Sequence, residues 1–128
     1  MNTVATIRLT IAAGETASEP FHLAVVSIVA LQSRGLLPYV QRISLPDTWH
    51  AATLGYEVST DGEQWAPLTD LRGPISCAAR PGQVLNSEPG IWRDVAWLRL
   101  RSEPAQPDDV SVVVDVSAYE TGVQQWRR

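Results

Sequence analysis

The chain has 128 residues, 45% of them hydrophobic, and a formal net charge of −4. A chain of this length can bury a core without disulfides or metal ions, and a single cysteine, Cys77, excludes an internal disulfide. The negative charge gives no attraction for nucleic acid or an anionic membrane surface, so we expect no nucleic-acid partner and no membrane insertion. We expect one domain, residues 1–118, followed by a C-terminal tail, residues 119–128.

The sequence shows no segment that would direct the chain to a membrane. Residues 1–10 lack the basic region and apolar block of a secretory signal. The longest apolar run, residues 23–31, is far shorter than the roughly 20 residues that span a bilayer. Both observations predict synthesis and folding in a cytoplasm.

The first part of the chain predicts three strands. In residues 3–11, apolar side chains alternate with polar ones, as in a strand with one buried face. Residues 20–31 are apolar on both faces, and their valine and isoleucine content favours a strand over a helix. Such a strand is central, or is covered by another layer or subunit. A third strand is predicted at residues 39–45, and residues 46–49 after it are predicted to form either a turn or one helical turn.

A β-hairpin is predicted at residues 51–70. Leu54, Tyr56 and Val58 alternate with polar or small residues, and Asp61-Gly62 is a strong signal for a tight turn. We expect Trp65, on the returning strand, to cover the apolar face of the outgoing strand.

Further short strands are predicted at residues 73–79, 83–86, 95–101 and 110–117. Short strands that recur between glycine- and proline-rich turns indicate an all-β fold, a single-domain β-sandwich of jelly-roll type. The predicted core consists of Ile7, Leu9, Val25, Leu54, Tyr56, Val58, Leu98, Leu100, Val112 and Val114.

No residue pattern indicates catalysis or metal binding. His22, His50 and Cys77 lack metal-ligand spacing, and there is no glycine-rich phosphate loop. We expect Cys77 to be a small buried hydrophobe and Asp108-Asp109 to be solvated loop charge. The sequence therefore predicts a non-enzymatic protein without metal or cofactor.

The chain is unusually rich in tryptophan, with five tryptophans and one phenylalanine, and this is its most informative compositional feature. Trp65 is expected in the core. Tryptophans near loops can stack on sugars, and Trp with Arg is typical of protein interfaces. The alternative for each ring is that it packs within the fold. The candidate contacts to a glycan or partner are Trp49, His50, Trp92 and Arg93. The candidate subunit interface consists of Trp97, Arg99, Arg101, Trp126 and Arg127.

Two resemblances extend this interpretation. LGYEVSTDGEQWAPL, residues 54–68, resembles the S-x-D-G-x-x-W hairpin of discoidin-like, galactose-binding-like jelly rolls. Over residues 3–117, the run ISLPDTW at 43–49, that hairpin, PGQ at 81–83, WLRLRS at 97–102 and the final valine strand together resemble small virion β-sandwiches of tailed phages, prophages and gene transfer agents.

The virion resemblance implies a structural component of a phage or gene-transfer-agent particle, such as the base or another part of a head spike or head fibre. It implies assembly in the bacterial cytoplasm, a homo-oligomer, and capsid, spike or fibre subunits as partners. The alternative is a carbohydrate-binding module that recognises cell-surface glycans.

The tail forms a separate prediction. Residues 119–128 have no apolar period, and they end in a large aromatic anchor, Trp126, followed by two arginines. Because such a combination suits a pocket on an acidic partner, we expect the tail to dock on a neighbouring subunit.

Overall fold

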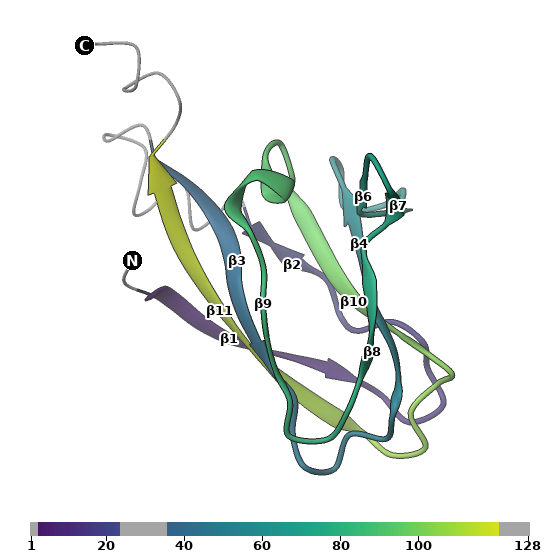
Figure 1. The fold of residues 1–128 in the computed structure, drawn as a ribbon. Helices are drawn as coiled ribbons and strands as arrows, with labels where there is room; N and C mark the ends of the chain where they lie inside the picture. Colours follow the sequence, from purple (N-terminus) through teal and green to yellow (C-terminus); the bar gives the residue numbers. More distant parts are fainter. Residues whose placement is uncertain (1–2, 24–35, 121–128) are drawn as a thin grey trace, which may run out of the picture.

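The structure is a computed structural model, and it describes residues 3–23 and 36–120. Two antiparallel sheets form a sandwich, with a small two-stranded hairpin at one end (Figure 1). The all-β prediction is confirmed, whereas the narrower assignment to the jelly-roll type stays a prediction. In the part of the chain described, no helix is long and apolar enough to cross a bilayer.

Sheet A has the strand order β1-β11-β3-β9. Its members are β1 (Thr3–Ile11), β11 (Val110–Glu120), β3 (Leu36–Ser44) and β9 (Val84–Asn86). β11 runs three residues past the predicted strand end at residue 117, because pairing with β3 continues to Glu120 opposite Leu36. The last strand therefore enters the segment that we expected to be tail, and residues 121–128 lie outside the described residues.

Sheet B has the order β2-β10-β4-β5, and β8 pairs with the other half of the same edge of β4. Its members are β2 (Phe21–His22), β10 (Trp97–Glu103), β4 (Ala52–Ser59), β5 (Ala66–Pro67) and β8 (Ser76–Ala79). β6 (Thr69–Asp70) and β7 (Gly73–Pro74) form the small hairpin, and one 3₁₀ turn, η2, covers Pro89–Trp92.

The core lies between the two sheets and contains most of the predicted residues. Leu9, Leu54, Leu98, Leu100, Val112 and Val114 are buried, and Ile7, Tyr56 and Val58 pack against them half-buried. Val25 belongs to the predicted strand at 20–31, most of which lies outside the described residues. The predicted core list did not include the two largest fully buried side chains, Trp49 and Trp92, for which packing within the fold was the alternative to a surface contact.

The central hairpin forms between β4 and β5, with Val58 paired to Ala66. Its turn is fixed by polar groups: the Asp61 carboxylate accepts from the Ser59 hydroxyl at 2.9 Å and from the backbone N–H of Gln64 at 3.0 Å. The prediction for Trp65 was wrong, because its half-buried ring lies outside the hydrophobic core cluster, beneath Arg99.

Two further predictions need correction. The strand expected at 73–79 is divided at Ile75 into β7 and β8, because the β6–β7 hairpin turns away from β4. Cys77 is exposed rather than buried, since β8 is an edge strand of sheet B.

Candidate functional site

Strand alternation builds one polar and aromatic surface on the outside of sheet B. Leu98 and Leu100 of β10 point into the core and are completely buried, so the residues between them point outward. The β10–β4 register sets Arg99 opposite Glu57 and Trp97 opposite Ser59. We define the outer face of sheet B by six side chains, His22, Glu57, Trp65, Trp97, Arg99 and Arg101.

Glu57 is the electrostatic centre of this face. Its Oε1 accepts a hydrogen bond from Arg99 Nε at 2.7 Å, and its Oε2 lies 3.4 Å from Arg101 Nη1. The Glu57 side chain is only 12% exposed, so these contacts are less screened than ordinary surface pairs. Arg101 also donates from Nε to Glu103 at 2.8 Å. This hydrogen bond, helped by the negative charge of Glu57, raises the pKa of Arg101 above its ordinary value.

The aromatic rings of the outer face are held by neighbours. The Trp97 ring stacks on His22 with a centroid separation of 4.1 Å and an interplanar angle of 2°. The Gly62 backbone approaches Trp97 from the β4–β5 turn, so closely that a Cβ there would lie 3.1 Å from the ring. The Arg99 guanidinium lies 4.4 Å from the centroid of the Trp65 ring. The face is therefore preorganised, with its rings already in contact.

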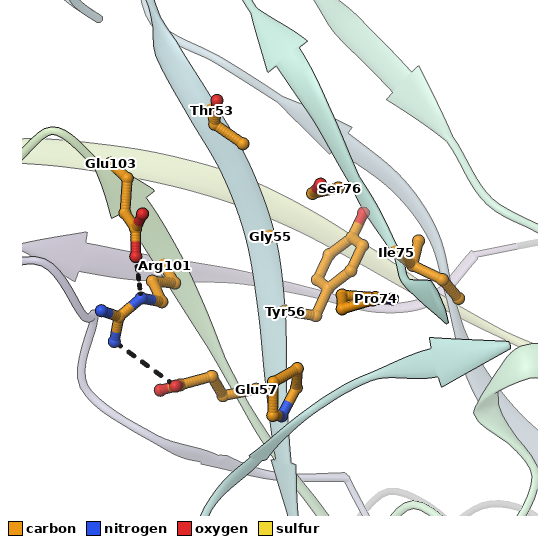
Figure 2. Close-up of a pocket in the computed structure, with 10 residues that line it drawn as sticks. Thr53, Gly55, Tyr56, Glu57, Pro74, Ile75, Ser76, Arg101 and Glu103 are labelled. Atoms are coloured by element: carbon orange, nitrogen blue, oxygen red, sulfur yellow. Dashed lines mark hydrogen bonds and ion pairs between the residues drawn. The ribbon is translucent and has the colours of Figure 1, made fainter. Parts of the chain in front are cut away.

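A hollow of about 450 Å³ opens beside Glu57 and Arg101 of the outer face of sheet B (Figure 2). Gly55 leaves part of its floor without a side chain, and the hydroxyls of Thr53 and Ser76 lie in its lining. Figure 2 shows Arg101 between the carboxylates of Glu57 and Glu103. Donors and acceptors thus stand together in a hollow with no large net charge.

The structure removes two predicted contact residues from the surface. Trp49 and Trp92 are 1% and 2% exposed, so neither ring can stack on a glycan or a partner in this conformation. Trp49 Nε1 donates to the carbonyl of Ala79 at 3.2 Å, and Trp92 Nε1 donates to Ser87 at 2.9 Å. Both rings lie in the core, and these two acceptors satisfy their indole N–H groups.

The other two members of that predicted group, His50 and Arg93, are exposed. The backbone of His50 is held at both its N–H and its carbonyl by the side chain of Gln106, at 2.8 and 2.9 Å. Gln106 is itself 1% exposed and also donates to Ser102. The sequence interpretation missed this buried amide, since a glutamine in a proline-containing loop gives no signal of burial.

Of the predicted subunit interface, Trp97, Arg99 and Arg101 do lie together on the outer face of sheet B. Trp126 and Arg127 lie outside the described residues. Glu57, which links the two arginines, was missed, and the signal that could have found it is the outward position of a charge at the centre of β4. Across residues 3–23 and 36–120, no group of three or more His, Cys, Asp or Glu side chains is arranged to hold a metal ion.

Comparisons with protein-family models, with curated proteins and with solved structures found no match for this chain.

Proposed function

We propose that the protein is a non-enzymatic structural component of a phage or gene-transfer-agent particle, as the base or another part of a head spike or head fibre. The observation that carries the proposal is the preorganised outer face of sheet B, where Glu57 holds Arg99 and Arg101. Trp and Arg are the residues most enriched at the energetic centres of protein interfaces. Because these side chains are already fixed, covering them costs little rotamer entropy.

The resemblance over residues 3–117 supplies the kind of partner. A particle subunit is held by neighbouring capsid, spike or fibre proteins, and its contact surface must be rigid enough to repeat in every copy. Glu57 is already paired with two arginines, so a partner that covers this face would not bury an unpaired carboxylate, which would weaken the contact. The outer face of sheet B therefore fits a lasting contact with another virion protein.

The test is incorporation into particles made by cells that carry this gene. Particles purified by density gradient from cells with a tagged chain should contain it, and the Arg99→Ala variant should incorporate several-fold less. Arg8→Ala is the matched control, since Arg8 is an exposed arginine on sheet A, and it should incorporate normally. Particles that lack the wild-type chain would overturn the proposal.

The neighbouring genes give an independent test of the same proposal. Portal, capsid and tail genes beside this one would support a virion role. Glycosidase genes there would favour the second candidate.

The second candidate is a carbohydrate-binding module, and the hollow beside β4 is the observation that favours it. Its hydroxyls, carboxylates and guanidinium offer donors and acceptors to a neutral, hydroxyl-rich ligand. Gly55→Ala is a suitable probe, because the added Cβ would meet Ile75 and Ser76 at ordinary contact distances of 3.7 Å while reducing the hollow. Calorimetric titration with host surface polysaccharide should show binding that Gly55→Ala weakens. An absence of heat with the wild type would reject this candidate.

A further inference from the structure

A different surface lies at the end of the molecule that carries the β6–β7 hairpin (Figure 1). Leu71 occupies the turn between β6 and β7, and its relative exposure is 107%. In the described part of the chain, the other large hydrophobic residue with marked exposure is Val84, at 52%. A leucine held fully in water at the tip of a turn contributes nothing to the core, so its apolar surface is available for a contact.

A groove of about 460 Å³ lies beside Leu71. Ile75 and Ile91, both half-buried, supply apolar surface within it. One wall is the β6–β7 hairpin, and the other is the chain from the end of β9 into η2. An apolar knob and an apolar groove therefore stand side by side at the same end of the molecule.

Charged side chains line both walls of the groove. Arg72 is an exposed residue of the hairpin wall, and Glu88 is an exposed residue of the opposite wall. Among the described residues, neither side chain makes an ion pair. The Asp70 carboxylate, the nearest acid in sequence, accepts from the backbone N–H of Arg72 at 2.7 Å. The hairpin wall thus carries the charges of Asp70 and Arg72, and the opposite wall carries the charge of Glu88.

We propose that this groove is a two-fold contact between two copies of the chain, with Leu71 of each copy seated between Ile75 and Ile91 of the other. A two-fold interface needs a surface that is complementary to itself, and a knob beside its own groove meets that condition. The same rotation brings Arg72 of one copy to Glu88 of the other, so the contact contains two Arg72–Glu88 ion pairs. The charge pattern favours a second copy over a lipid surface, because a membrane would meet Glu88 unpaired.

This inference does not rest on the proposed virion role, because it uses another surface and needs no particle. Lasting interfaces bury about 1,200–2,000 Å² in total, and a contact centred on one leucine per copy is at the weak end of that scale. The isolated protein should therefore exchange between monomer and dimer as its concentration changes, and added salt should favour the monomer.

Sedimentation velocity on the full chain over a wide concentration range tests the contact. Wild type should shift towards dimer with rising concentration. Leu71→Ser should lower the association constant by about tenfold or more, in line with the loss of an interface anchor. Val84→Ser is the matched control, since it removes the other exposed hydrophobe from outside the groove lining, and it should associate like wild type. Because Leu71 has no packing partner to lose, circular dichroism of its variant should match wild type.

Charge reversal makes the test specific for the reciprocal arrangement. Arg72→Glu and Glu88→Arg should each weaken association, and the double variant should recover it, because the pair is rebuilt with its signs exchanged. A wild-type chain that stays monomeric overturns the proposal, as does association that survives Leu71→Ser. Binding of the monomer to anionic or neutral phospholipid vesicles without self-association would assign Leu71 to a membrane contact and would also overturn it.

Discussion

Arg99 Nε lies 2.7 Å from Glu57 Oε1, directly across the ladder that joins β10 to β4. The same guanidinium covers the ring of Trp65. One arginine thus ties the central strand pair to the β4–β5 hairpin, and a single carboxylate holds it in place. This relationship makes the outer face of sheet B a fixed surface rather than a set of independent side chains.

Replacement of Glu57 by glutamine should destabilise the fold. The variant leaves Arg99 and Arg101 without their shared carboxylate. Because the Glu57 side chain is only 12% exposed, the loss should be about 1–2 kcal/mol of unfolding free energy, more than an exposed pair contributes. Urea denaturation measures it. Glu103→Gln is the control, because the Glu103 side chain is 61% exposed and its loss should cost less than about 0.5 kcal/mol. Equal losses in the two variants would contradict the central role of Glu57.

Gly62 and Gly14 form a matched pair for the contact with Trp97. Both have a positive φ, +81° and +79°, but a Cβ on Gly14 meets nothing within 4 Å, whereas one on Gly62 meets the Trp97 ring. Gly14→Ala should therefore cost about 1 kcal/mol from backbone strain alone, and Gly62→Ala about 1 kcal/mol more from overpacking. Thermal unfolding compares them, and equal costs would mean that Trp97 moves aside freely.

The buried role of Trp49 predicts sensitivity to a small change. Trp49→Phe removes ring volume and leaves the carbonyl of Ala79 without its 3.2 Å donor, so unfolding free energy should fall by about 2–3 kcal/mol. Trp65→Phe, at a half-buried ring outside the core cluster, should cost about 1 kcal/mol or less. Urea denaturation of both variants measures the two losses of unfolding free energy. A Trp49 variant as stable as the Trp65 variant would contradict the assignment of Trp49 to the core.

The turn at Asp61 predicts a pH effect of defined sign. Hydrogen bonds from the backbone N–H groups of Gln64 and Glu63 and from the Ser59 hydroxyl hold the pKa of Asp61 below its ordinary value. A carboxyl whose pKa is lower in the folded state adds stability above its unfolded pKa of about 3.9 and loses it as pH falls through the folded value. Stability measured against pH should therefore fall less steeply below about pH 4 in Asp61→Asn than in wild type. If the stability of the two proteins falls equally steeply below about pH 4, Asp61 does not have this role.

Local patterns were sufficient to predict much of the fold. The alternation in β10 placed Leu98 and Leu100 in the core and Arg99 outside, because a strand has only two faces. Asp61-Gly62 predicted its turn, since Gly62 adopts a positive φ, which glycine does without steric cost. In each case the information lies within a few neighbouring positions.

The parts that were missed depend on distant contacts. Glu57 and Arg99 are separated by 42 positions, and only the register of β4 with β10 brings them together. Trp49 and Trp92 stand beside turns in the sequence, yet they are buried because the carbonyl of Ala79 and the hydroxyl of Ser87 accept from their indoles. The alternation of apolar and polar residues within one strand contains no information about such distant partners.

Cryo-electron microscopy of intact particles from cells that carry this gene tests the proposed virion role most directly. The proposal predicts density for this sandwich in the particle, with Trp65, Arg99 and Arg101 on the outer face of sheet B covered by another virion protein. Particles without this chain, or a bound chain whose outer face of sheet B is open to solvent, would contradict it.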